Sequence, residues 1–267
     1  MPDRTSDAIK EALEAPVRGW DFSWLEGRAQ ETSPPWDFRE LVRQASLDAN
    51  RMLDIDTGGG EFLSTLAPFS PYVVATEGYP PNTGVAYERL APLGCPVIRI
   101  ASAPDNIDQE GVDASSTGSA LPFASAAFDL IIDRNSSYWP SEAFRILRPG
   151  GRFITQQRGE TGEVGRSWAE LFGRPPHPHS GFTLAFAVEQ LARAGFRITR
   201  AEEADTPMTF QDLAGVVYYL RLVPWAVAGF DPLADRASLE QINGRLERDG
   251  RLQIRGSHML IEATAER

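Results

Sequence analysis

Short apolar runs rich in β-branched residues alternate with segments of helical periodicity from residue 51 onward. The alternation predicts strands at 51–56, 72–77, 96–101, 128–133, 152–157, 196–201 and 258–264, with 251–255 as a candidate partner of the last strand. Regular alternation of this kind requires parallel strands joined by right-handed crossovers, with helices on both faces. We therefore expect an α/β fold built on a doubly wound, mostly parallel sheet of seven strands.

Two segments lie outside this alternation. Residues 1–50 contain Trp20, Phe22, Trp24 and Trp36, which predict either an aromatic lid over a substrate or a small N-terminal core. The segment 206–250 is too long to be a structureless loop, so we expect helices there. The predicted organisation is a helical and aromatic N-terminal cap segment, 1–50, and one domain, 51–267, with a helical insertion at about 206–250.

Composition restricts the partners and the compartment. The net charge of −11 repels phosphate backbones and so disfavours a nucleic-acid partner. Cys95 is the one cysteine, which excludes an internal disulfide and fits a reducing compartment. The first twenty residues lack the apolar core of a signal peptide, and Arg221 and Pro224 interrupt the most apolar later run. We expect a cytoplasmic protein with a small-molecule substrate, no nucleic-acid partner and no membrane partner.

The stretch RMLDIDTGGGEFLSTLAP, residues 51–68, puts three glycines between a strand and a helix start. Glycine lets a ligand approach the backbone closely, and a helix N-terminus offers free N–H groups. The dinucleotide pattern G-x-G-x-x-G would use Gly58 and Gly60, but Leu63 takes the place of its third glycine. With Asp54 inside the strand, the pattern is instead D-x-x-x-G-x-G.

This pattern resembles the first motif of class I S-adenosylmethionine-dependent methyltransferases, D/E-x-G-x-G-x-G, which Asp54, Gly58 and Gly60 match. The segments LPFASAAFDLIID (121–133) and FRILRPGGRFI (144–154) also resemble the family around its fourth and fifth strands. The resemblance covers residues 50–160 and is closest to the broad type 11 group that includes quinone-biosynthesis enzymes. It implies a Rossmann-like fold, S-adenosylmethionine as the cofactor and S-adenosylhomocysteine as the product.

The resemblance implies a cofactor site at the ends of the first strands. Glu77 ends the second strand and is suited to both ribose hydroxyls, because a carboxylate is a bidentate acceptor. The backbone of Arg134 and Asn135 is expected to border the methionine end of the cofactor. The full set of predicted cofactor residues is Asp54, Asp56, Thr57, Gly58, Gly60, Glu77, Gly78, Asn106, Arg134 and Asn135.

Two places depart from the family pattern. Asp56 stands where the family has its first glycine, and its carboxylate would disturb the turn, contact the cofactor's ammonium group or impair cofactor binding. The connection after the third strand is long, and we favour Asn106 as the adenine contact among its four candidates, Asp105, Asn106, Asp108 and Asp113.

The sequence does not single out one catalytic residue. His177 and His179, in the proline-rich loop GRPPHPHSG, are candidate general bases, with a plain exposed loop as the alternative. They lack further ligands nearby, so no metal site is predicted. Tyr138 is the third candidate, and it either lines the acceptor pocket or packs in the core. The stretch NSSY, 135–138, is only faintly like the N/D-P-P-Y/F motif of base-amine methyltransferases, because both prolines are absent.

Several other residues have a structural prediction beside a functional one. Asp129 is expected to stabilise loops at the start of its strand, and His258 is expected to be structural. Tyr218 and Tyr219 lie in an apolar run, where they either contact substrate or pack.

The expected function is methyl transfer from S-adenosylmethionine to a small-molecule acceptor. The alternatives are an RNA or protein methyltransferase on the same core, and a non-catalytic or nicotinamide nucleotide-binding protein. The acidic balance disfavours RNA, and Leu63 disfavours the nicotinamide alternative. Because the cofactor's methyl group is already a good electrophile, the protein's main task would be to position the nucleophile and exclude water.

Overall fold

The computed structural model describes residues 3–17, 20–69, 72–159, 164–175 and 181–266. The chain divides into two compact units, each assembled from three separate stretches. Unit 1 contains 1–34, 159–180 and 204–257, and unit 2 contains 35–158, 181–203 and 258–267.

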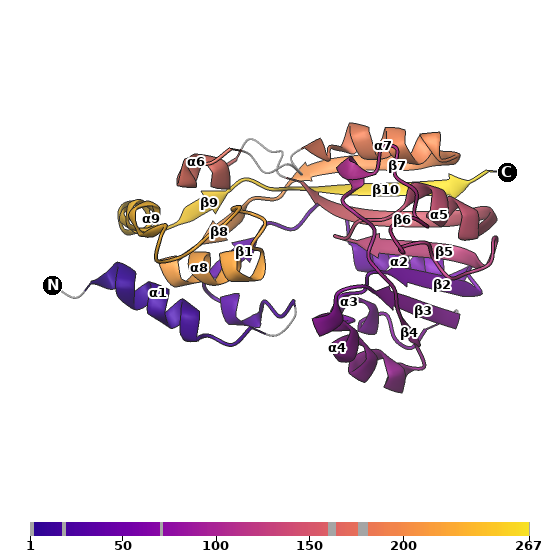
Figure 1. Ribbon diagram of the computed structural model, residues 1–267, viewed down its shortest axis with the longest axis horizontal. Helices are drawn as coiled ribbons and strands as arrows, with labels where there is room; N and C mark the ends of the chain where they lie inside the picture. The colour runs from indigo at the N-terminus through magenta and orange to yellow at the C-terminus, as the bar shows by residue number, and fades with distance from the viewer. Residues whose placement is uncertain (1–2, 18–19, 70–71, 160–163, 176–180, 267) are drawn as a thin grey trace. The chain divides into compact units, whose positions relative to one another are not determined.

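A seven-stranded sheet in the order β4-β3-β2-β5-β6-β10-β7 is the centre of unit 2 (Figure 1). Its strands are β2 (Arg51–Ile55), β3 (Tyr72–Glu77), β4 (Val97–Arg99), β5 (Phe128–Arg134), β6 (Leu147–Gly159), β7 (Phe196–Asp205) and β10 (Ser257–Ala265). The pairs β2–β3, β3–β4, β2–β5 and β5–β6 are all parallel. The predicted α/β fold with a mostly parallel seven-stranded sheet is confirmed.

The helices of unit 2 begin and end where local sequence signals place them. They are α2 (Phe38–Leu47), α3 (Glu61–Ser64), α4 (Pro80–Leu90), α5 (Pro140–Ile146) and α7 (Leu184–Arg193), with short 3-10 helices at Ala91–Leu93 and Asn106–Asp108. The hydroxyl of Thr183 accepts a hydrogen bond from the N–H of Phe186 at 3.2 Å and so caps α7.

Strand order determines where a ligand can bind in this unit. Strand β2 lies between β3 and β5, so the chain leaves β2 toward one side of the sheet and later returns on the other side. Open α/β sheets bind their ligands at such a switch point, beyond the carboxyl ends of the strands. The glycine run follows β2 directly and therefore lies at this point.

Asp129 stabilises the opposite end of the same strands. Its Oδ2 accepts hydrogen bonds from the backbone N–H groups of Asn50 at 2.7 Å and Arg51 at 2.8 Å. Its Oδ1 lies 2.7 Å from Nε of Arg148. The structural role predicted for Asp129 is confirmed.

Unit 1 contains a small antiparallel sheet in the order β1-β8-β9 and four α-helices among its described residues. Its elements are α1 (Arg4–Glu14), the 3-10 helix Ser23–Leu25, β1 (Ala29–Glu31), α6 (Trp168–Phe172), β8 (Met208–Phe210), α8 (Leu213–Leu222), α9 (Arg236–Asp249) and β9 (Leu252–Ile254). Helices α8 and α9 lie in the segment for which the sequence predicts helices. No helix in the described ranges has both the length and the apolar character needed to cross a membrane.

The predicted pairing of segment 251–255 with the last strand is wrong. Strand β9 pairs with β8, whereas β10 lies between β6 and β7. The side chains of Leu252 and Ile254 are 5% and 2% exposed, and both pack in the apolar core of unit 1. This burial holds β9 in the small sheet.

The N-terminal aromatic residues do not form one cluster. Trp36 belongs to unit 2, where its Nε1 donates a hydrogen bond to Oε1 of Gln156 at 2.8 Å. Trp24 belongs to unit 1, and its ring lies 4.5 Å from that of Tyr218. The hydroxyl of Tyr218 donates to the carbonyl of Pro16 at 2.8 Å, and the ring is 1% exposed, so this tyrosine packs rather than lining a pocket.

Candidate cofactor site

The turn after β2 brings bare backbone to the end of the sheet. Asp56, Gly58 and Gly60 have positive φ angles of 47°, 67° and 77°. A Cβ on Gly60 would lie 2.8 Å from Cγ of Leu90, which is fully buried in α4. Only glycine meets both conditions at this position, because it tolerates left-handed backbone and has no Cβ.

Glu77 faces this turn. Its Oε2 accepts a hydrogen bond from the N–H of Gly58 at 2.7 Å, and its Oε1 accepts one from the N–H of Tyr79 at 2.7 Å. An ionised carboxylate has about four acceptor sites. Two bonds to the backbone fix the orientation of Glu77 and leave acceptor capacity for the hydroxyls of a ribose.

Asp56 connects the loops that follow β2 and β3. Its backbone N–H donates to Oγ1 of Thr76 at 3.1 Å, and its Oδ1 accepts from the N–H of Gly78 at 3.2 Å. The backbone of Thr57 continues the connection, because its N–H donates to the carbonyl of Thr76 at 2.9 Å. Aspartate tolerates a left-handed backbone better than most residues. The turn therefore forms with Asp56 in place of the family's glycine, and its carboxylate is engaged by the neighbouring loop.

Four carboxyl groups meet at the ends of β2, β3 and β5, namely Asp54, Asp56, Glu77 and Asp133. Burial, and to a smaller extent the negative charge of Asp56, raises the pKa of Asp54 and of Glu77 to about 7 in each case. Burial is also the main cause of the raised pKa of Asp56 and of Asp133. Each of these groups is therefore easier to ionise when a positive charge binds nearby.

Asp133 is a site residue that the motif analysis does not include. Its Oδ1 accepts a hydrogen bond from Oγ1 of Thr155 at 2.9 Å, and the side chains of Ser136 and Gln157 also donate to this carboxylate. The signal that could have found it is its place at the end of a central strand, which is the argument already applied to Glu77.

Arg134 and Asn135 continue from the end of β5, next to these carboxylates. The guanidinium of Arg134 lies 5.1 Å from the ring centre of Phe62, and its positive charge lowers the pKa of Asp54 against the dominant effect of burial. Asn135 has a φ of 59°, and its N–H donates to the carbonyl of Gln156 at 2.9 Å. The structure thus brings nearly all of the predicted cofactor residues to one edge of the sheet.

Asn106 is the exception. Its Nδ2 donates to the carbonyl of Tyr138 at 3.2 Å and to Oε1 of Gln190 at 3.1 Å, and its Oδ1 accepts from the N–H of Tyr138 at 3.3 Å. The residue is 4% exposed. Because these bonds occupy both of its donors, the predicted adenine contact does not fit, and Asn106 instead fastens α7 to the loop after β5.

The catalytic candidates are not assembled at this site. The Tyr138 hydroxyl is buried without a hydrogen-bond partner in the described part of the chain, and its ring lies 4.9 Å from that of Phe153 in the core. Burial raises its pKa, which makes it a poor proton donor, so the predicted catalytic role of Tyr138 does not fit. His177 and His179 lie outside the described residues. His258 is buried, and burial lowers its pKa to about 4, which fits its predicted structural role.

No group of three or more His, Cys, Asp or Glu side chains within the described ranges is arranged to hold a metal ion.

Comparison with known proteins gives matches in structure alone. No family model and no curated protein matches the chain. A presumed methyltransferase from Bacillus halodurans C-125 matches at 20% identity and a TM-score of 0.57, over 86% of this chain and 99% of that one. The YcgJ protein from Bacillus subtilis matches at 13% identity and a TM-score of 0.52, over 86% of this chain and 98% of that one. The [4+2]-cyclase SpnF matches at 15% identity and a TM-score of 0.52, over 99% of this chain and 93% of that one.

The chain therefore has the fold of class I S-adenosylmethionine-dependent methyltransferases, as the motif resemblance implies. The same comparison includes a protein named as a cyclase. A shared fold does not select one reaction, because the reaction depends on the residues of the site.

Proposed function

We propose that the protein binds S-adenosylmethionine at the turn 56–60 and transfers its methyl group to a small-molecule acceptor. The observation that supports this best is the 2.7 Å hydrogen bond from the N–H of Gly58 to Glu77. It joins bare backbone and a bidentate acceptor at the switch point of the sheet, where a nucleoside fits.

The charge at the site favours this cofactor over a dinucleotide. S-adenosylmethionine carries a sulfonium and an ammonium group, whereas a nicotinamide dinucleotide carries a negatively charged pyrophosphate. Burial raises the pKa values of Asp54, Asp56, Glu77 and Asp133, so the cations would favour the ionised forms of these carboxyl groups, while a pyrophosphate at the same turn would disfavour them. The nicotinamide alternative is therefore disfavoured by electrostatics as well as by Leu63.

Four of the predicted cofactor residues, together with Asp133, have a task in this proposal. Glu77 would accept hydrogen bonds from the ribose, and the backbone of Gly58 and Gly60 would allow the cofactor to approach closely. Asp54 and Asp133 would stabilise its positive charge. The bound cofactor supplies an electrophilic methyl group, so the protein has to align the acceptor with the S–CH₃ bond and exclude water. A base is needed only for an acceptor that arrives protonated.

A small molecule is the acceptor that the charge balance supports. The net charge of −11 opposes binding of RNA over an extended surface.

Calorimetry tests the cofactor half of the proposal. S-adenosylmethionine and S-adenosylhomocysteine should each bind with one-to-one stoichiometry, and NADH should release no heat under the same conditions. Absence of both heat and thermal stabilisation with the two adenosyl ligands would remove the proposal, and binding of NADH alone would replace it with the nicotinamide alternative.

Transfer is tested separately from binding. The protein would be incubated with methyl-labelled S-adenosylmethionine and pools of phenols, amines, thiols and carboxylic acids, with S-adenosylhomocysteine release as the measurement. Cofactor binding without release in any pool would contradict the transfer half and favour a reaction of another kind on this fold, as in SpnF.

A further inference from the structure

A groove of about 920 Å³ lies within unit 1, between the end of α9, strand β9 and the segment that leads into α6. Five of its lining residues are arginines and two are acids. They are Arg166, Arg245, Arg248, Arg251 and Arg255, with Glu170 and Asp249. Leu252 is the one large apolar residue of the lining.

Backbone hydrogen bonds hold Arg166 and Arg255 beside each other. The N–H of Arg166 donates to the carbonyl of Gln253 at 3.0 Å, and the N–H of Arg255 donates to the carbonyl of Arg166 at 2.9 Å. Gly165 makes this approach possible, because a Cβ there would lie 2.8 Å from the carbonyl oxygen of Gln253. Gly250, with a φ of 70°, ends α9 and turns the chain into β9. Two separate stretches of the chain, 165–170 and 245–255, are thus joined around one groove.

Most of the positive charge in the groove is not neutralised. Arg255 forms an ion pair with Glu170, with a distance of 3.4 Å between Nη2 and Oε1. Arg166, Arg248 and Arg251 are exposed, and none of them has an ion pair with another described residue. The lining carries a net charge of +3 on a chain whose net charge is −11.

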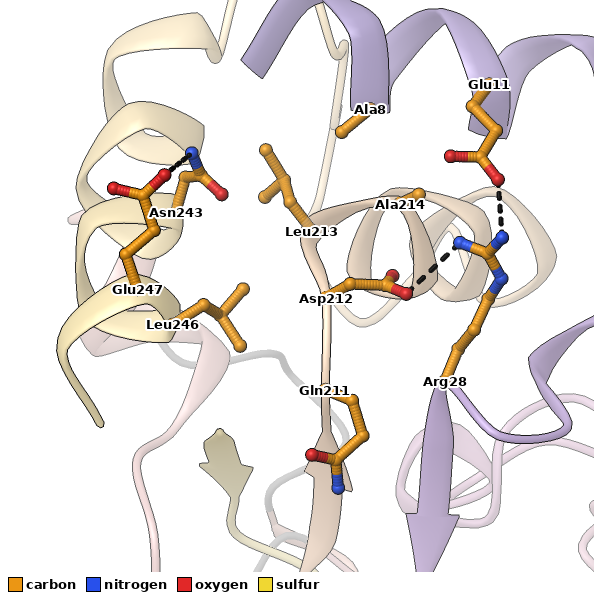
Figure 2. A pocket seen from close by; sticks show the side chains of 10 residues that line it. All are labelled: Ala8, Glu11, Arg28, Gln211, Asp212, Leu213, Ala214, Asn243, Leu246 and Glu247. Carbon is orange, nitrogen blue, oxygen red and sulfur yellow. Dashed lines mark hydrogen bonds and ion pairs between the residues drawn. The ribbon is translucent and has the colours of Figure 1, made fainter. Parts of the chain in front are cut away.

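Another pocket of unit 1 contains an arginine whose charge is neutralised by carboxylates of the chain. In this pocket, of about 250 Å³, the guanidinium of Arg28 lies between the carboxylates of Glu11 and Asp212 (Figure 2). Asp212 is 3.1 Å away, and the guanidinium also lies 4.2 Å from the ring centre of Trp24. The charge of Arg28 is compensated within the chain, unlike the charges of the groove.

Helix electrostatics explain only part of the arrangement. A cation in the last turn of a helix is favourable, which accounts for Arg248 at the end of α9. Arg166, Arg251 and Arg255 lie outside that helix, so the helix dipole does not account for them. Like charges that line one groove repel one another, and a bound anion would remove this cost.

We propose that the groove binds a small molecule that carries two or more phosphate groups. Guanidinium groups match phosphate oxygens in geometry and charge, and the groove has the volume of a small-ligand pocket. Its polar lining does not suit an apolar ligand. This site lies in unit 1, and the proposal stands independently of the cofactor site in unit 2.

Calorimetry with inorganic pyrophosphate and inorganic triphosphate tests the proposal. We expect one-to-one binding that weakens as sodium chloride is added, and a loss of affinity of about tenfold or more in the double variant Arg248→Gln/Arg251→Gln. The matched control is Arg193→Gln, since Arg193 is an exposed arginine of α7 that pairs with Glu189 in unit 2. It should bind like the unaltered protein.

The melting temperature and the affinity for S-adenosylhomocysteine are the two controls for the double variant. The double variant should keep its melting temperature, because both side chains are exposed, and should keep its affinity for S-adenosylhomocysteine. Equal triphosphate affinity in the double variant and the unaltered protein would overturn the proposal. Displacement of triphosphate by S-adenosylhomocysteine, or tighter arginine-dependent binding of a single-stranded RNA, would overturn it as well.

Discussion

The two units carry charged sites of opposite sign and opposite construction. In unit 2, Glu77 is 3% exposed and is oriented by backbone N–H groups at the ends of adjacent strands. In unit 1, exposed arginines from two stretches of the chain line an open groove. Because the first site is buried, its affinity for a ligand depends on the protonation of its carboxyl groups and on individual contacts. The exposed cations of the second site act mainly through their charge. The difference predicts a selective cofactor site and a more tolerant anion site.

The largest expected effect tests how rigid the turn of unit 2 is. Gly60→Ala should lower the free energy of unfolding by about 2–5 kcal/mol, because alanine combines left-handed backbone strain with overpacking against Leu90. Chemical denaturation would measure it. The control is Gly84→Ala in α4, where a Cβ meets open space and alanine should stabilise by up to about 1 kcal/mol. Equal stability of the two variants would show that the turn is not constrained as described.

The second-largest expected effect is a loss of affinity for the ligand of unit 2 with no change for the ligand of unit 1. Glu77→Gln should weaken binding of S-adenosylhomocysteine by about tenfold to a hundredfold, because an ionised acceptor is replaced by a neutral one. Triphosphate binding in unit 1 should not change. The control is Glu88→Gln, which removes an exposed charge from α4. If Glu77→Gln and Glu88→Gln bound S-adenosylhomocysteine equally well, Glu77 would have no part in the cofactor site.

The pH should change the affinity of the candidate cofactor site, because this site contains carboxyl groups. Glu77 and Asp54 have pKa values of about 7, so affinity for the cationic S-adenosylmethionine should rise by up to about tenfold between pH 6 and pH 8 as they ionise. Calorimetry at a series of pH values would measure this rise. A flat profile would mean that these groups do not face the bound cofactor.

Stability should change with pH in the opposite direction. Both pKa values are raised above their usual 3.8 and 4.5, so the folded state holds protons that the unfolded state has released. The stability contribution of these two groups is present below about pH 4 and is lost as the pH rises to about 7. Melting temperatures across this range would test the sign, with Asp54→Asn expected to flatten the curve. A melting temperature that rose over the same range because of these groups would contradict the pKa assignment.

The smallest expected effect concerns Tyr138. Tyr138→Phe removes a buried hydroxyl without a partner, so stability should stay within about 1 kcal/mol or rise. Binding of S-adenosylhomocysteine should not change. Once an acceptor is known, turnover should also be unaffected. A large loss of turnover at unchanged stability would restore Tyr138 as a catalytic residue.

Much of the geometry of the candidate cofactor site could be predicted from sequence because its parts are local. A strand followed by glycines, and an acid at the end of the next strand, can each be recognised within a few residues. The parallel topology then brings both strand ends to the same edge of the sheet, so Gly58 and Glu77 meet without any further information.

The errors occur where packing between distant segments decides. Asn106 is polar and lies in a long loop, which suggests a ligand contact, but Gln190 of α7 and the backbone of Tyr138 occupy its side chain. Asp133 has a local signal in its place at the end of a central strand, but its partners Thr155 and Gln157 come from another strand and are known only from the structure.

The sequence by itself determined the succession of strands and helices in unit 2, the fold class and the place of the glycine turn, because periodicity and backbone freedom are properties of neighbouring residues. Only the tertiary structure decided that β9 pairs with β8, that Tyr138 is buried, and that arginines from two stretches line one groove. These features depend on which surfaces meet when apolar area is buried, and that is a property of the whole chain rather than of any segment.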